Sequence, residues 1–499
     1  MQYKSTRNKG IAVSSAEAIK KGLSSEGGLF VPESFPAVSK DEIKDLANKT
    51  YRERAYFVLS KFLTDFTDEE LSYCIDNAYT KQKFETDTIA PLYKLNDKTY
   101  ILELWHGPTC AFKDMALQIL PYLLTTSMKK TNEDKQIVIL VATSGDTGKA
   151  ALEGFSDVPG TKIMVFYPDN GVSEIQKLQM VTQDGDNVGV TAVKGNFDDA
   201  QSGVKMIFTD EEYKEALEDS GYKLSSANSI NWGRLVPQIV YYFSSYADMV
   251  KSGEINVGDK VNIVVPTGNF GNILASYYAY KMGLPVNKFI CASNENNVLT
   301  DFINTGVYNK NREFHTTISP SMDILISSNL ERFLYDVSGE NDELIKTLMQ
   351  KLNTEGVYEV DDSIKSKLSE LFVADCADDK ETMETIKKCS DDYGYVIDTH
   401  TSVAYAVYNK YVAKTGDTTK TIIASTASPF KFNQSVLIAL EGHNSVVGKG
   451  EFELLEYLSE KSGMEIPNSL YELKTKPVVF DSVCDKTALK QIVNEFLNV

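Results

Sequence analysis

Residues that build metal sites and disulfide scaffolds are scarce in this sequence. Its 499 residues include four histidines and six cysteines, and the cysteines are scattered without C-x-x-C spacing. Zinc sites and small disulfide-stapled domains need such clusters, so we expect neither a metal nor a disulfide framework. The N-terminal segment also lacks the apolar core of a signal peptide. Together these absences predict a protein of the reducing cytoplasm.

Long apolar runs and an excess of positive charge are also missing. No run approaches the roughly 20 apolar residues that a membrane helix needs, so we expect no membrane association. The chain has 51 Lys and Arg residues against 70 Asp and Glu, a formal net charge of −19. Such a chain repels a phosphate backbone, which argues against nucleic acid as a partner. We expect a small-molecule substrate, which would need local cations if it is anionic, and a monomer or small homo-oligomer.

What the sequence does contain is an alternation of short apolar runs with helical stretches. Continuous apolar strands alternating with helices predict an α/β fold whose parallel sheets are covered on both faces. Binding sites in such folds gather at the carboxyl ends of the strands. The predicted strands lie at 136–142, 162–168, 187–193, 260–265, 287–293 and 420–425.

The length predicts two or three domains. We expect a mostly helical N-terminal domain at 1–90, a first α/β lobe at 91–260 and a second at 261–499. The acidic and helical segment at about 330–395 is expected to be an insertion or a helical cover.

Three segments have the composition of anion-binding sites. "PTGNFGN" (266–272) combines two glycines with a following helical stretch, so its backbone N–H groups can surround a phosphate. "TSGDTG" (143–148) can present hydroxyls and amides to a carboxylate, oriented by Asp146. "NSINWGRLVPQ" (228–238) contains Arg234, a partner for a second anion. The alternatives are a tight packing turn for 266–272, a helix cap for 143–148 and a structural salt bridge for Arg234.

Lys113, in "WHGPTCAFKDMALQ" (105–118), stands among small and apolar residues. An apolar site lowers the pKa of a lysine and leaves a free amine, which can form a Schiff base or move protons. A buried lysine and a glycine loop for one phosphate are what pyridoxal phosphate needs. The alternative is a lysine that extends along a helix face to solvent.

Five motifs in this order resemble the threonine synthase family, in the longer form found in many bacteria and fungi. They are "HGPTCAFKDMA", "ATSGDTGKAA", "NSINWGRLVPQIVYY", "PTGNFGNILA" and "STASPFKF". The resemblance implies a fold-type-II pyridoxal-phosphate enzyme with two lobes, parallel-rich sheets and flanking helices. It also implies conversion of O-phospho-L-homoserine and water to L-threonine and phosphate.

The resemblance assigns roles position by position. Lys113 corresponds to the lysine that binds the cofactor covalently and is the expected catalytic residue. The matched cofactor-binding residues are Gly268, Asn269, Phe270, Gly271 and Asn272 at the phosphate and Thr426 at the pyridine ring. The matched substrate-carboxylate residues are Ser144, Gly145, Asp146 and Thr147, to which we add Arg234 for the substrate phosphate. Ser428 replaces a histidine common in the family, whereas His400 is kept.

Elimination at Cγ of phosphohomoserine requires proton removal at Cα and then at Cβ. Lys113 is the amine whose surroundings suit both steps. Water has to be excluded until late, so we expect two lobes to close over the site. Two alternatives remain: another fold-type-II lyase, such as a serine/threonine dehydratase or a related phospho-lyase, and a non-catalytic homologue that binds pyridoxal phosphate.

Overall fold

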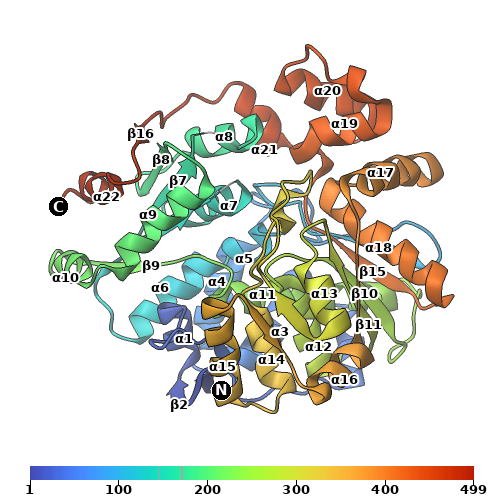
Figure 1. Cartoon of the computed structure of the whole chain (residues 1–499), viewed down its shortest axis with the longest axis horizontal. Coiled ribbons are helices and arrows are strands. Elements are labelled where there is room, and N and C mark those ends of the chain that lie inside the picture. Colours follow the sequence, from blue (N-terminus) through green and yellow to red (C-terminus); the bar gives the residue numbers. More distant parts are fainter. Residues whose placement is uncertain (144, 170–171) are drawn as a thin grey trace.

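The computed structural model describes residues 1–143, 145–169 and 172–499. These residues form an N-terminal unit and two lobes, each lobe built on a mainly parallel sheet with helices packed against it (Figure 1). Among the described helices, none combines the length and the apolar character that a bilayer span requires.

The N-terminal unit contains four helices, each of which begins with a capping box. In each box a Ser or Thr side chain accepts a hydrogen bond from the N–H of a Glu three residues later, which satisfies a free helix donor. The unit also contains a three-stranded antiparallel sheet that the sequence pattern did not indicate. The strands are β1 (Tyr3–Ser5), β2 (Asn8–Val13) and β3 (Phe30–Pro32), and the helices are α1 (Ser15–Lys21), α2 (Lys40–Leu46), α3 (Tyr51–Phe62) and α4 (Asp68–Ala78).

The smaller lobe has a five-stranded, fully parallel sheet in the order β16-β8-β7-β6-β9. The predicted strands at 136–142, 162–168 and 187–193 are confirmed as β6, β7 and β8. The strands are β6 (Gln136–Ala142), β7 (Thr161–Pro168), β8 (Val188–Val193), β9 (Tyr222–Ser225) and β16 (Val483–Cys484). The helices are α6 (Leu120–Lys130), α7 (Asp146–Phe155), α8 (Glu174–Val181), α9 (Phe197–Thr209), α10 (Glu211–Asp219) and α22 (Leu489–Leu497).

The larger lobe has a six-stranded sheet in the order β14-β11-β10-β15-β5-β4, in which only β4 runs antiparallel to its neighbour. The predicted strands at 260–265, 287–293 and 420–425 are confirmed within one residue as β10, β11 and β15. The strands are β4 (Leu92–Lys94), β5 (Thr99–Glu103), β10 (Val261–Pro266), β11 (Val286–Ser293), β14 (Phe372–Cys376) and β15 (Thr421–Ser425). A separate antiparallel pair consists of β12 (Val307–Asn309) and β13 (Val357–Glu359).

Helices α11 to α18 accompany this second sheet and its connections. They are α11 (Trp232–Lys251), α12 (Gly271–Met282), α13 (Val298–Thr305), α14 (Leu330–Val337), α15 (Asp342–Thr354), α16 (Asp362–Leu371), α17 (Asp379–Tyr393) and α18 (Thr399–Thr415). The remaining helices are α5 (Asp114–Leu117), α19 (Asn433–Glu441), α20 (Glu451–Ser462) and α21 (Asn468–Tyr471), with 3₁₀ turns at Pro320–Met322, Pro429–Phe432, His443–Ser445 and Glu472–Lys474.

The sheets do not follow the contiguous lobes expected from the sequence. Strands β4 and β5, expected in the first lobe, complete the larger sheet, and β16 returns from the C-terminal region to the smaller one. Strands pair through the backbone N–H and C=O groups along their edges, and edges that packing brings together need not be neighbours in the chain. The segment 330–395 is likewise not purely helical, because it contributes β13 and the edge strand β14, whose short run lies between long acidic helices.

Four strand ends place the predicted site segments. Strands β5, β10 and β15 of the larger sheet lead into the segments of Lys113, of residues 267–272 and of Thr426. Strand β6 of the smaller sheet leads into residues 143–148. Because parallel strands present their carboxyl ends at one edge, these segments can meet between the two lobes.

Candidate active site

Lys113 lies at the start of α5, and its side chain is 12% exposed. Its Nζ donates a hydrogen bond to Ser321 Oγ at 3.3 Å and lies 3.8 Å from Asp146 Oδ2. Burial lowers the pKa of Lys113, and the charge of Asp146 opposes that shift without cancelling it. The amine is therefore directed at Ser321 and Asp146, and its lowered pKa favours the free form that can accept a proton.

The residues around Lys113 form a turn that is closed by Asp114. The backbone N–H and the hydroxyl of Thr109 each donate to the Asp114 carboxyl group at 2.8 Å. A Cβ at Gly107 would lie 2.6 Å from Asp114, so the glycine permits this close approach. Burial raises the pKa of Asp114 to about 7. The "HGPT" and "AFKD" parts of the motif are thus two sides of one turn.

Thr426 is held beside Lys113 by backbone pairing. The Phe112 N–H donates to the Thr426 carbonyl at 2.8 Å, and the Ser428 N–H donates to Cys110 O at 3.0 Å. The residue after β15 consequently lies next to the lysine-bearing turn. Ser428, at the position where relatives often have histidine, is buried and its hydroxyl accepts from the N–H of Phe430.

Asp146 has a second cationic neighbour, Lys431, which the sequence analysis did not single out. Lys431 is fully buried, and its Nζ lies 2.5 Å from Asp146 Oδ1. Gln176 also donates to Asp146 Oδ1, at 3.0 Å. Lys431 holds the pKa of the Asp146 carboxyl well below its ordinary value, against the opposing effect of burial. Asp146 is therefore an ionised counter-ion between Lys113 and Lys431.

A histidine supports the other side of Lys113. The backbone N–H of Ser321 donates to His400 Nε2 at 3.1 Å, so this ring nitrogen must be the unprotonated one. His400 Nδ1 then carries the proton and donates to Asp398 Oδ1 at 3.0 Å. Asp398 also caps α18. This chain of contacts holds Ser321 against Lys113 Nζ.

The 266–272 segment forms a tight loop at the N-terminus of α12. Phe270 adopts a left-handed backbone conformation with φ of 61°. A Cβ at Gly268 would lie 2.8 Å from the carbonyl oxygen of Ser321, so this position has no room for a side chain. Asn269 O accepts from the N–H of Asn329 at 3.1 Å. The buried amide nitrogen of Asn272 has no hydrogen-bond partner among the described residues.

Arg234 lies in the first turn of α11 and is buried. Its Nη1 donates to the Ala227 carbonyl at 2.5 Å, whereas its Nε has no partner within the described parts of the chain. No described carboxylate lies within ion-pair distance of it, so the alternative of a structural salt bridge is not seen here. Burial lowers the pKa of Arg234 to about 10, a value that keeps the guanidinium charged near pH 7.

The 143–148 turn is described only in part. Ser144, predicted to bind a substrate carboxylate, lies outside the described residues. Gly145 packs so closely that a Cβ there would lie 2.5 Å from Gln176 Nε2. Thr147 is half-buried in the first turn of α7. Since the Asp146 side chain is anionic, only backbone N–H groups and hydroxyls of this turn could receive a carboxylate.

Sequence reasoning missed four contributors to this site. Lys431 and the pair Tyr241–Tyr242, which contacts Asn272, were inside quoted motifs but were given no role. Ser321 stands in the short 3₁₀ turn Pro320–Met322, in a stretch without hydrophobic periodicity, so nothing in the sequence marks it. The missing signal was spatial, because Lys431, the tyrosine pair and Ser321 reach the site from three different parts of the chain.

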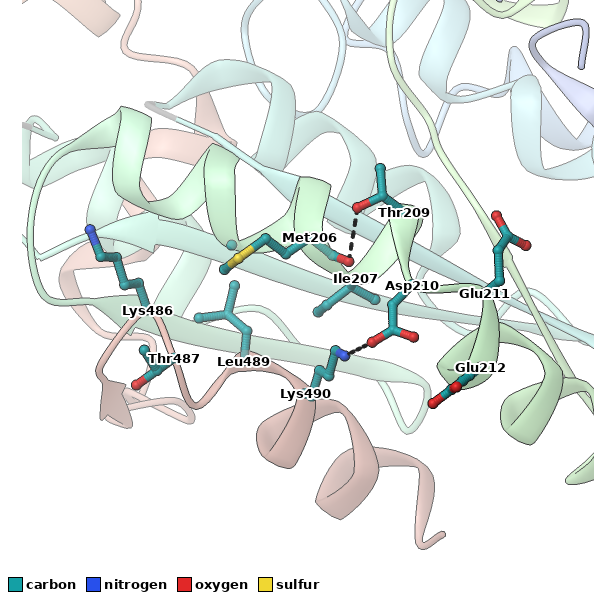
Figure 2. A pocket seen from close by; sticks show the side chains of 11 residues that line it. Met206, Ile207, Thr209, Asp210, Glu211, Glu212, Lys486, Thr487, Leu489 and Lys490 are labelled. Carbon is teal, nitrogen blue, oxygen red and sulfur yellow. Dashed lines mark hydrogen bonds and ion pairs between the residues drawn. The ribbon is translucent and has the colours of Figure 1, made fainter. Parts of the chain in front are cut away.

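A surface hollow between α9, α10 and α22 does not have this chemistry. It has a volume of about 700 Å³, and Figure 2 shows Lys490 paired with Asp210 on its wall. Lys486 at the same hollow is paired with Asp199 at 2.8 Å. Both cations already have carboxylate partners, so the buried cluster around Lys113 is the stronger candidate site.

The buried cluster fits pyridoxal phosphate. It offers an amine with a lowered pKa, a glycine loop at a helix N-terminus, and a hydroxyl residue beside the amine. It also offers a buried amide donor that has no partner within the described ranges. No part of this donor set conflicts with that group.

Family models match three successive segments of the chain. "Threonine synthase N terminus" matches residues 2–79, "Pyridoxal-phosphate dependent enzyme" matches 85–361, and "Threonine synthase, C-terminal" matches 401–493. Together they extend over nearly the whole sequence.

Individual relatives agree with these matches. Threonine synthase of Saccharomyces cerevisiae is 36% identical over 99% of this chain and 98% of its own length. Human "Threonine synthase-like 1" is 42% identical over 85% of this chain, and the match spans only 58% of that longer protein. The solved structure of pyridoxal-phosphate-bound threonine synthase from Brucella melitensis is 33% identical, with a TM-score of 0.89 and full coverage of both chains. The lysine-bearing turn, the glycine loop and these matches agree: the chain belongs to the threonine synthase family of pyridoxal-phosphate-dependent enzymes.

Proposed function

We propose that this chain converts O-phospho-L-homoserine and water to L-threonine and phosphate, with pyridoxal phosphate held by Lys113. One observation carries the proposal: an amine of lowered pKa lies in a site that also contains two buried donors, Asn272 Nδ2 and Arg234 Nε, which have no partner in the part of the chain that the structure describes. Two donors of this kind suit a cofactor phosphate and a substrate phosphate.

The cofactor would be held at three places. Lys113 Nζ would bind it covalently, the loop 268–272 would receive its phosphate, and Thr426 would face its ring nitrogen. When bound, pyridoxal phosphate supplies an electron sink that stabilises negative charge at the substrate carbon.

Lys113 would then move the protons of the reaction. Once the amine of the substrate has taken its place on the cofactor, the freed Lys113 amine would accept a proton from Cα and, after giving that proton up, another from Cβ. This task suits a lysine whose pKa is lowered by burial. Ser321 Oγ, which accepts from Nζ, would keep the amine in one orientation between these transfers.

The substrate would be held by its two anionic ends. The backbone N–H of Asp146 and the Thr147 hydroxyl would receive the carboxylate, because the Gly145 N–H already donates to Thr143 Oγ1 at 3.0 Å and the Asp146 side chain is paired with Lys431. Arg234 would bind the phosphate through two of its N–H groups.

Location and assembly follow from the sequence in the same proposal. The chain would work in the cytoplasm as a monomer or a small homo-oligomer, with an N-terminal unit and two α/β lobes as its domains. Light scattering of the purified protein measures the assembly state directly.

The test is turnover by the purified chain. We expect stoichiometric phosphate and threonine from phosphohomoserine, and borohydride reduction of the cofactor-bound protein should label the Lys113 peptide. Pyruvate from serine or 2-ketobutyrate from threonine, without phosphohomoserine turnover, would favour a dehydratase. Phosphate release from another phosphorylated amine alone would favour a related phospho-lyase, and cofactor binding with no turnover a non-catalytic homologue.

A further inference from the structure

Asn272 is the second residue of α12 and only 7% exposed. Its carbonyl oxygen Oδ1 accepts a hydrogen bond from Tyr241 at 2.8 Å and another from Tyr242. An amide oxygen has two lone pairs, so both are used. The amide nitrogen of the same side chain is buried and has no partner among the described residues.

The two tyrosines determine which way the amide faces. Tyr242 has Asn272 Oδ1 as the acceptor of its hydroxyl proton, and a half-turn of the amide would replace that acceptor with an N–H₂ group. Tyr241 lies also within 3.1 Å of Gln238 Oε1, so it alone would tolerate either orientation. The pair together therefore favours oxygen toward the tyrosines and nitrogen away from them.

Both hydroxyls are dependable donors. Tyr241 and Tyr242 are completely buried, and burial raises the pKa of each well above its ordinary value. Both hydroxyls therefore stay protonated near neutral pH. Their rings pack at 4.8 Å between centroids, which restricts both side chains.

Helix α11 connects the buried Arg234 to the tyrosines that contact Asn272 in the glycine loop. Arg234, Gln238 and Tyr241 are spaced by four and three residues, so they share one face of the helix. Gln238 Nε2 donates to Arg234 O at 2.8 Å, and α11 packs directly against α12. One helix thus reaches both the buried arginine and the amide of the loop.

We propose that Tyr241 and Tyr242 are positioning residues that hold Asn272 with its amide nitrogen ready to donate to a phosphate at the N-terminus of α12. This inference rests on the proposed use of pyridoxal phosphate, which supplies that phosphate. The amide adds a side-chain donor to the free backbone N–H groups of the helix.

The experiment compares two ligands that differ only in the phosphate. The full chain, freed of cofactor with hydroxylamine and dialysed, is titrated with pyridoxal phosphate and with pyridoxal, and absorbance gives the ratio of the two affinities. The variants are Asn272→Ala, Tyr241→Phe, Tyr242→Phe and the double Phe variant. Phenylalanine keeps the ring and removes only the hydroxyl.

We expect Asn272→Ala to reduce the preference for pyridoxal phosphate roughly tenfold or more, the value of one charge-assisted hydrogen bond. The double Phe variant should lose a similar part of the preference for pyridoxal phosphate, and Tyr242→Phe should lose more of it than Tyr241→Phe. Pyridoxal affinity should stay near the wild-type value in all four. Tyr246→Phe is the matched control, because this buried tyrosine of α11 donates to Asp259 O at 2.8 Å and does not contact Asn272.

Four results would overturn the proposal. Equal weakening of both ligands would indicate a purely structural role. An unchanged affinity ratio in Asn272→Ala would show that the amide does not bind the phosphate. An unchanged ratio in the Phe variants, together with a reduced ratio in Asn272→Ala, would show that the tyrosines do not position the amide. A wild-type chain that binds both ligands equally would contradict the proposed cofactor site itself. If the double variant does not fold, the two single variants decide.

Discussion

At Lys113, the effect of burial on the amine is greater than the effect of its nearest carboxylate. Asp146 lies 3.8 Å from Nζ, yet it is also paired with Lys431 at 2.5 Å, so much of its charge is already compensated. Lys431 and Arg234, both cations, add to the lowering of the Lys113 pKa that burial begins. A site rich in buried positive charge therefore exists inside a chain of net charge −19.

Arg234→Lys should impair binding of the phosphorylated substrate. A guanidinium can bind two phosphate oxygens at once, and an ammonium cannot reproduce this. We expect a higher KM for phosphohomoserine, with kcat/KM lower by roughly tenfold to a hundredfold, and an unchanged cofactor absorbance spectrum. Lower thermal stability with near-normal kinetics would instead assign Arg234 a structural role.

Asp114→Asn should change how stability depends on pH. The pKa of Asp114 is raised by burial to about 7 in the folded chain, against about 3.9 in an unfolded one. The folded state therefore keeps its proton while the unfolded state loses it, so this group's contribution to stability is full below about pH 4 and is lost as pH rises through 7. Asparagine removes that dependence.

The measurement is the difference in Tm between Asp114→Asn and wild type from pH 4 to 8. We expect the Tm of the variant to rise relative to that of wild type as pH rises. The pKa shift of Asp114 corresponds to a change of up to roughly 4 kcal/mol in the free energy of unfolding. A difference that stays constant across this range would show that Asp114 does not titrate there.

Among the elements, the loop before α12 depends most on glycine, because there is no room for a side chain at Gly268. Its conformation combines a left-handed Phe270 with a glycine that touches the backbone of another segment. The sequence pattern predicted this loop and its helix correctly, because glycines at a strand–helix junction have a local cause. The contact of Gly268 with Ser321 is not local, and the pattern did not indicate it.

Gly268→Val should weaken cofactor retention. Its Cβ would lie 2.8 Å from Ser321 O, a backbone atom that cannot turn aside, so the loop itself must move. Gly271→Val should do less, because its Cβ would meet the side-chain nitrogen of Asn329 at 3.3 Å. The fraction of cofactor kept after dialysis measures both.

The control for the loop variants is Gly450→Ala, where the nearest atom to a Cβ is a flexible Glu453 oxygen at 3.7 Å. It should keep the cofactor as wild type does. If Gly268→Val also retains it fully, the loop does not hold the phosphate.

Across the whole molecule, the chain visits each lobe more than once. After α21 the C-terminal segment crosses to the smaller lobe, where β16 adds to the sheet and α22 lies beside α9 (Figure 1). The Ala192 and Lys194 N–H groups donate to carbonyls of Ser482 and Cys484, each at 2.9 Å. Movement of one lobe relative to the other must therefore be accommodated by this crossing segment.

Removal of residues 478–499 should loosen the smaller lobe selectively. Strand β8 would lose β16, one of its two neighbours, and apolar residues of α22 such as Val493 would no longer cover α9. Hydrogen exchange should become faster in β8 and α9 and stay unchanged in β10 and β11. Lys490→Gln, which removes only the half-exposed pair with Asp210, should change little, within about 1 kcal/mol. Unchanged protection of β8 after truncation would contradict this.

The sequence by itself determined the local features of this protein. Buried strands, helix caps, the glycine loop and the apolar frame of Lys113 depend on residues that are close in the chain, and their patterns could be interpreted directly. The family could be identified because its motifs are local as well.

Only the tertiary structure decided which distant residues meet. It assigned β4, β5 and β16 to their sheets, placed Lys431 against Asp146, and brought Ser321 and His400 to the lysine. It also directed Tyr241 and Tyr242 at Asn272. These contacts join residues far apart in sequence, and their free energy depends on packing and burial that no local pattern records.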